Sequence, residues 1–202
     1  MDEGERIGLF GGSFDPIHTG HLMLAQRALD FAGLDRVLFI PTASPPHKPG
    51  HVLSSFDDRR RMVELAIRDN GRFEISLIEG SGDPSYTWQS ILRFAGEGYT
   101  RDRLHLLVGT DSLSEIPGWR RPDVIFERAT IVAMRRNGFE AVANLPRGAT
   151  VIMLETGANS ISASEIRRLV RAGRSIRYLV PDAVERYIEE HGLYAEGAGG
   201  AC

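Results

Sequence analysis

The most restrictive segment of this sequence is residues 8–22, which read GLFGGSFDPIHTGHL. The apolar residues at positions 7–10 predict a short buried strand that ends at the glycine pair following it. The residue before Pro16 is disfavoured in the helical region, so we expect a turn at that point. A helix should follow, with Thr19 as its N-cap. The segment therefore predicts a strand, a glycine-rich turn and a helix in immediate succession.

Two imidazoles flank the expected start of this helix, His18 just before it and His21 in its first turn. Free backbone N–H groups and the positive end of the helix dipole attract phosphate there. Gly20 removes a side chain where a ligand would approach closely. The alternative is an ordinary strand–turn–helix with two surface histidines, but the glycine-rich entry favours a phosphate site. We expect no zinc site, because only two candidate ligands occur in this segment and the single cysteine is Cys202. No residue is assigned as a metal ligand.

Composition sets the class of protein. A chain of 202 residues with 42% hydrophobic and 25% charged residues is typical of one globular domain. The net charge of -3 argues against a nucleic-acid polymer as partner. No apolar run is long enough to cross a bilayer, and the first residues lack the basic start of a secretion signal, so we expect a cytoplasmic protein. We expect one domain over residues 1–195 and a disordered tail over 196–202.

Apolar runs alternate with amphipathic stretches along the chain, which predicts an α/β fold with a parallel sheet. We expect a single Rossmann-like domain with helices on both faces of that sheet. In the helix expected over residues 57–70, the run Arg59-Arg60-Arg61 is typical of a solvated face. The expected strands are residues 7–10, 37–40, 73–78, 104–108, 129–134 and 151–154.

Residues 8–22 resemble the signature GxFDPxHxGH of the nucleotidyltransferase family related to class I aminoacyl-tRNA synthetases. The form GGSFDPIHTGHL is most similar to the bacterial nicotinate-nucleotide adenylyltransferases of that family. ISASEIR at residues 161–167 resembles a second signature, ISxTxxR, with Ser164 in place of threonine. Ser162 and Glu165 also have the spacing of a helix capping box. Both signatures should meet at the carboxyl edge of the sheet.

The resemblance implies adenylyl transfer from ATP, accompanied by Mg²⁺, to nicotinate mononucleotide, giving deamido-NAD and pyrophosphate. It implies that the catalytic residues are His18 and His21. The ATP-binding residues that it implies are Gly11, Ser13, Phe14, His18, Gly20, His21, Gly109, Asp111, Ile161, Ser162 and Arg167. The residues implied for the mononucleotide are Gly12, His47, Lys48, Tyr86, Thr87, Trp119, Arg120 and Arg135. A homo-oligomer is compatible with these assignments.

Several of these residues also have a purely structural interpretation. The proline-rich loop that carries His47 and Lys48 is by composition a solvated connector. Asp111 is equally suited to capping a short helix or to accepting hydrogen bonds from ribose hydroxyls. Trp119, in a Gly/Pro loop, has an apolar face suited to stacking on an aromatic ring. Two alternative functions remain: a sister adenylyltransferase acting on nicotinamide mononucleotide or phosphopantetheine, and a non-catalytic nucleotide sensor.

Overall fold

The computed structural model describes residues 4–43, 54–79, 86–134, 145–154 and 161–195. Its described strands form one six-stranded sheet of order β3-β2-β1-β4-β5-β6, in which every neighbouring pair is parallel. This is the strand order of a Rossmann-like sheet, as predicted. The strands are β1 (Ile7–Gly12), β2 (Arg36–Pro41), β3 (Phe73–Ile75), β4 (Leu104–Gly109), β5 (Thr130–Met134) and β6 (Val151–Leu154).

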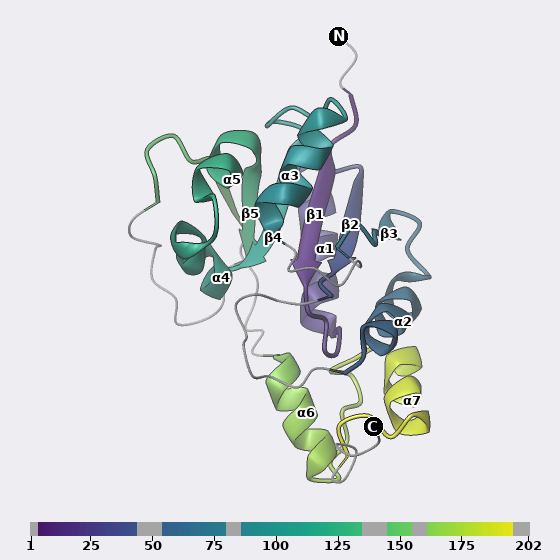
Figure 1. The fold of residues 1–202 in the computed structure, drawn as a ribbon. Helices are drawn as coiled ribbons and strands as arrows, with labels where there is room; N and C mark the ends of the chain where they lie inside the picture. The colour runs from purple at the N-terminus through teal and green to yellow at the C-terminus, as the bar shows by residue number, and fades with distance from the viewer. Residues whose placement is uncertain (1–3, 44–53, 80–85, 135–144, 155–160, 196–202) are drawn as a thin grey trace.

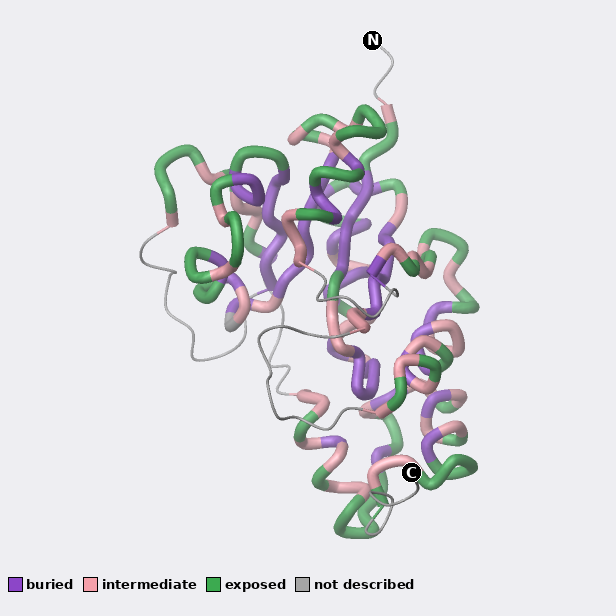
Figure 2. Tube along the Cα trace, in the orientation of Figure 1, coloured by how far each residue is buried: buried purple, intermediate pink, exposed green. Residues whose placement is uncertain are grey.

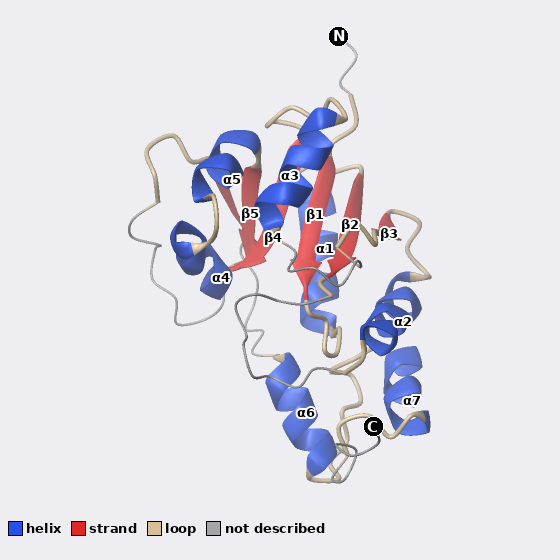
Figure 3. Ribbon diagram, viewed as in Figure 1, coloured by secondary structure: helices blue, strands red, loops and turns tan. Residues whose placement is uncertain are grey.

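Helices cover both faces of the sheet, which confirms the predicted α/β architecture (Figures 1 and 3). Figure 1 shows α6 and α7 beyond the arrowheads of β1 and β2, next to the carboxyl edge. Functional loops of an open α/β sheet gather at that edge. The helices are α1 (Thr19–Phe31), α2 (Phe56–Ile67), α3 (Thr87–Gly96), α4 (Thr110–Glu115), α5 (Pro122–Arg128), α6 (Ala163–Arg171) and α7 (Asp182–Glu190), with a 3₁₀ turn at Ile116–Gly118.

The core forms two layers because successive strand residues point to opposite faces. In β2, Val37 and Phe39 pack on the side of α1, whereas Leu38 and Ile40 pack on the side of α3 and α5. Figure 2 shows the central strands of the sheet as the buried centre of the molecule. Strands buried on both faces read as continuous apolar runs, which is the pattern found in the sequence.

Three elements differ from the sequence predictions. The helix predicted over residues 57–70 ends at Ile67. The third strand ends at Ile75 instead of continuing to residue 78, and it lies at an edge of the sheet. Helix α5 was not predicted, although Pro122 at its first turn is a recognised helix-start signal. A helix of this length carries too little periodicity to stand out in the sequence.

Four predictions concern the chain as a whole. Within the described residues, no helix is both long enough and apolar enough to serve as a transmembrane span. The cytoplasmic location and the domain over residues 1–195 stay predictions. The tail over residues 196–202 lies outside the described residues.

Candidate active site

The site is located by the order of the strands. From β1 the chain builds the sheet outward through β2 and β3, and from β4 it builds in the opposite direction. The carboxyl ends of β1 and β4 are therefore the switch point at which open α/β sheets bind ligands. A loop over residues 13–18 joins the end of β1 to the start of α1, whereas α4 starts directly after β4.

The N-cap of α1 is His18, so the prediction of Thr19 at that position was wrong. Thr19 is the first helical residue, and its N–H and Oγ1 both donate to the Leu179 carbonyl, at 2.9 and 3.0 Å. The backbone N–H of His18 donates to Nδ1 of His21 at 3.2 Å. His21 Nδ1 thus accepts the N–H of the N-cap residue, which is the bond that the third helical residue makes in a capping box, while the Thr19 hydroxyl is engaged by the distant Leu179.

The two histidine rings are stacked, with centroids 3.7 Å apart and planes 23° from parallel. His18 is only 4% exposed, and His21 lies edge-on to Phe14 at 5.1 Å. They are therefore not two surface histidines. Because Nδ1 of His21 accepts a backbone N–H, the proton of its neutral ring is on Nε2. In this tautomer Nε2 is the hydrogen-bond donor of the His21 ring.

The second signature meets the first through Arg167. Its Nη1 donates to the Asp15 carbonyl at 2.6 Å, which joins segments 152 residues apart, as predicted. Ser162 is the N-cap of α6 and accepts the Glu165 N–H at 3.2 Å. The carboxylate of Glu165 pairs with Arg168 at 2.7 Å. One half of the predicted capping box is therefore formed, in which Ser162 accepts the Glu165 N–H. The Glu165 carboxylate pairs with Arg168 instead of completing the other half.

Three glycines of β1 and β4 have different reasons to be glycine. A Cβ added at Gly8, inside β1, would lie 2.8 Å from Leu107 and 2.9 Å from Leu34, so packing requires glycine there. A Cβ added at Gly11 or Gly109 meets no described atom within 4 Å. Internal packing among the described residues does not explain these two glycines, whereas close approach of a ligand would.

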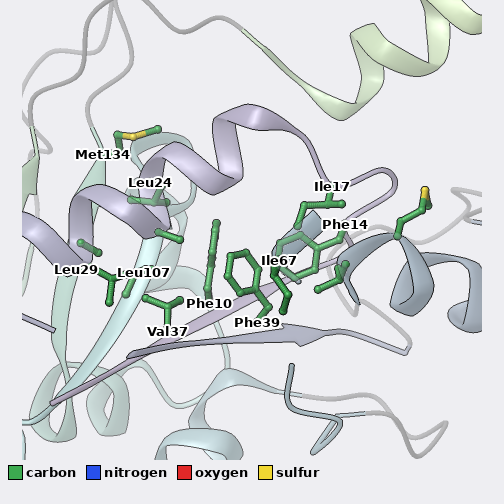
Figure 4. Close-up of a cluster of buried hydrophobic side chains, with 14 of the residues drawn as sticks. Phe10, Phe14, Ile17, Leu24, Leu29, Val37, Phe39, Ile67, Leu107 and Met134 are labelled. Atoms are coloured by element: carbon green, nitrogen blue, oxygen red, sulfur yellow. The ribbon is translucent and has the colours of Figure 1, made fainter. Parts of the chain in front are cut away.

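The residues expected at the nucleoside are placed as follows. Gly109 is the N-cap of α4, so Asp111 is not the cap of that helix and lies in its first turn; its side chain is outside the described part. The Phe14 side chain belongs to the core, where it packs against Phe10 and Phe39 (Figure 4). Ile161 is half-buried just before α6.

Two segments expected at the pyridine ring lie beside each other. Tyr86 is the N-cap of α3, and Thr87 is its first residue, so the Thr87 N–H has no acceptor within the helix. Arg120 Nη1 donates to the Tyr86 hydroxyl at 3.2 Å, and its guanidinium lies 5.0 Å from the ring centroid. Trp119 is half-buried and packs partly against the core on this face. The structure therefore brings these segments together.

Other expected site residues are less informative. Gly12 lies at the end of β1, where an added Cβ would meet the Phe14 ring at 3.1 Å, and Gly20 is buried in α1. Three of the residues implied for the mononucleotide lie outside the described part of the chain, namely His47, Lys48 and Arg135.

Residues 9–169 match the model of the cytidylyltransferase-like family, which is most of the chain. The chain belongs to this family. A relative from Thermus thermophilus named "Probable nicotinate-nucleotide adenylyltransferase" is 44% identical over 191 residues, covering 94% of this chain and 99% of its own length. One of the same name from Geobacillus kaustophilus is 40% identical, covering 96% of this chain and 88% of its own length.

Solved structures show the same fold. The structure titled as the Plasmodium falciparum nicotinic acid mononucleotide adenylyltransferase complexed with NaAD has a TM-score of 0.77 at 17% identity, covering 95% of this chain and 98% of that one. A putative nicotinate-nucleotide adenylyltransferase from Vibrio parahaemolyticus has a TM-score of 0.68 at 18% identity, covering 96% and 97%. The Rossmann-like architecture is therefore shared across low sequence identity.

The sequence did not reveal the buried role of Arg59. The prediction that Arg59 belongs to a solvated face was wrong. Arg59 is 1% exposed, and it donates to the carbonyls of Ser13 and Thr42, each at 2.8 Å. Burial lowers the pKa of its guanidinium, and the nearby Asp15 carboxylate opposes that shift. A signal was present, because Arg59 lies three and four residues before two buried apolar side chains of α2, at the spacing of one helix face.

We expect Arg59→Met to lower the free energy of unfolding by about 2–4 kcal/mol, because the carbonyls that the guanidinium holds lose their donors in a buried place. Arg61→Met is the matched control, since Arg61 lies on the exposed side of the same helix, and its effect should stay within about 0.5 kcal/mol. Urea unfolding of both variants measures the difference. Equal stabilities would show that the buried arginine does not hold the two loops.

Proposed function

We propose that this chain transfers the adenylyl group of ATP to nicotinate mononucleotide, forming deamido-NAD and pyrophosphate. The observation that carries the proposal is the convergence of His18, His21 and Arg167 on one loop at the switch point of the sheet. The names of the relatives support the substrate pair. A phosphate site with two imidazoles and an arginine offers both alignment and charge neutralisation.

The chemistry is an in-line displacement at the α-phosphorus of ATP. A phosphate oxygen of the mononucleotide forms the new P–O bond, and the bond from the α-phosphorus to the bridging oxygen of pyrophosphate breaks. Such a reaction needs positioning and charge stabilisation more than a protein nucleophile, so no covalent intermediate is expected. We assign His21 Nε2–H and the positive end of the α1 dipole to the charge that develops on the transferred phosphoryl oxygens.

The leaving pyrophosphate is assigned to the start of α6. Ser162 caps α6. The helix dipole and the N–H groups in the first turn of α6 suit an anion. Arg167 uses Nη1 for the Asp15 carbonyl, and its guanidinium has further N–H donors for phosphate. We place the β- and γ-phosphates between these two residues.

Mg²⁺ is assigned to the triphosphate and not to a protein cage. No group of three metal-ligating side chains occurs among the residues that the structure describes. Mg²⁺ commonly keeps several waters and binds through substrate phosphates, so the donor set suits an ion carried by ATP. When bound, the ion would neutralise charge on the phosphate oxygens.

Discrimination between acid and amide substrates is assigned to the start of α3. A carboxylate on the pyridine ring would accept the Thr87 N–H, whereas an amide presents N–H donors of its own in one of its orientations. Mispaired polar groups cost about 1–3 kcal/mol each. The geometry thus favours nicotinate over nicotinamide mononucleotide, and it favours both over phosphopantetheine, which has no aromatic ring to stack on Trp119.

We expect kcat/KM at saturating ATP to be about a hundredfold higher for nicotinate than for nicotinamide mononucleotide, as mispaired donors at the pyridine substituent imply. Trp119→Ala should lower kcat/KM for both mononucleotides and leave most of their ratio intact, because stacking is common to both. Equal efficiency of the wild type on the two substrates would contradict the specificity. A variant that loses the ratio but keeps its affinity would show that Trp119 acts by something other than stacking.

A further inference from the structure

The C-terminal part of the chain contacts the loop that leads into α1 from two directions. The Tyr194 hydroxyl donates to Asp15 Oδ1 at 2.6 Å, across 179 residues of sequence. The Leu179 carbonyl accepts from Thr19 at the start of α1. The two contacts lie on either side of His18, so residues far along the chain hold both ends of the segment that carries it.

Asp15 is the centre of this arrangement. It is 1% exposed, its Oδ1 is held by the Tyr194 phenol, and its Oδ2 lies 4.0 Å from Nη1 of Arg167. The same Nη1 donates to the backbone carbonyl of Asp15. The position of Arg167 therefore depends on the position of Asp15, and Asp15 is held in turn by Tyr194.

The loop needs support from outside itself. Phe14, immediately before Asp15, has a φ of 48°, in the left-handed region that a bulky residue adopts only when its surroundings impose it. Arg59 holds the residue before Phe14 through the Ser13 carbonyl, and Tyr194 holds the residue after it through the Asp15 carboxylate.

The phenol is suited to this task. Burial and the neighbouring Asp15 carboxylate both raise the pKa of Tyr194, so the hydroxyl keeps its proton and remains a donor. Tyr194 itself has a φ of 65°, so the chain accepts a second left-handed residue where the ring reaches Asp15. Such conformations cost free energy and persist where other contacts compensate.

We propose that Tyr194 is a positioning residue for ATP: its phenol fixes Asp15, and through Asp15 it fixes the Arg167 guanidinium that binds the triphosphate. The inference rests on the proposed function for the identity of the ligand. Tyr194 touches neither substrate in this arrangement, and its effect reaches ATP through Arg167.

The test uses Tyr194→Phe, which removes one oxygen, with Tyr187→Phe as the matched control. Tyr187 donates to Asp58 at 2.9 Å, so the control loses the same kind of phenol–carboxylate bond from the same C-terminal region, away from Asp15. By calorimetry without acceptor, Tyr194→Phe should raise the Kd of ATP about tenfold, as loss of a hydrogen bond to a charged group can. The control should leave that Kd within about twofold, and both variants should leave the Kd of nicotinate mononucleotide unchanged.

A double-mutant cycle tests the route. In an Arg167→Ala background, Tyr194→Phe should change the Kd of ATP less than about twofold, because residues that act through each other are not additive. The proposal is overturned if the effect persists in that background, if both substrates weaken equally, if the two tyrosine variants behave alike, or if Tyr194→Phe fails to fold. A wild type that binds ATP but transfers nothing would refute the proposed function instead, and would leave the ATP titrations to decide the role of Tyr194.

Discussion

His21→Ala should lower kcat by at least about a hundredfold, the size of effect that follows removal of one donor to developing transition-state charge. The donor is the Nε2–H of His21. Because Nδ1 accepts the His18 backbone N–H, the ring proton is on Nε2. Steady-state turnover at saturating substrates measures it. The same substitution also removes a capping acceptor and the ring that packs on Phe14, so stability must be followed as well.

Two polar substitutions separate these roles of His21. In His21→Asn the amide oxygen replaces Nδ1 as acceptor for the His18 N–H, and no group replaces Nε2. In His21→Gln the amide nitrogen replaces Nε2 as donor, and Nδ1 is lost. We expect the asparagine variant to be the more stable and the glutamine variant to be the more active. Near-wild-type turnover in His21→Asn would contradict the assignment of Nε2 to catalysis.

Arg167→Ala should raise the Kd of ATP about a hundredfold, because a guanidinium makes strong charge-assisted bonds to phosphate. The Kd of nicotinate mononucleotide should change by less than about threefold, since the α6 start is assigned to the leaving phosphates. Arg167→Lys should recover part of the loss, because lysine retains the charge without the planar fork.

Arg168→Ala is the control for this series. Arg168 follows in the same helix and pairs with Glu165 at the surface, so its removal takes away the same charge without touching Asp15. Isothermal titration of the four proteins with each substrate gives the comparison. Equal weakening of ATP and mononucleotide in Arg167→Ala, or an equal effect of the two alanine variants, would count against the assignment.

The sheet was predictable because its signal is local. Strands such as β2 are buried on both faces and read as continuous apolar runs, and the alternation with amphipathic segments specifies parallel neighbours. The meeting of Asp15 with Arg167 was also predictable, because the carboxyl ends of parallel strands share one edge.

The contacts that the sequence did not predict involve residues far apart along the chain. Thr19 has the residue type of an N-cap, but its hydroxyl is engaged by the Leu179 carbonyl, which nothing near Thr19 in the sequence indicates. Arg59 was assigned to solvent because arginines are seldom fully buried, and its carbonyl acceptors come from two separate loops. The link from Tyr194 to Asp15 spans nearly the whole chain. Short-range patterns carry no information on such pairs.

Release of pyrophosphate from ATP, measured with nicotinate mononucleotide, nicotinamide mononucleotide, phosphopantetheine or no acceptor, tests adenylyl transfer most directly. We expect rapid release with nicotinate mononucleotide, accompanied by an equal amount of deamido-NAD, and release about a hundredfold slower with the amide. Phosphopantetheine and the sample without acceptor should release none. Fastest release with phosphopantetheine, release without any acceptor, or ATP binding with no release under any condition would each contradict the assignment.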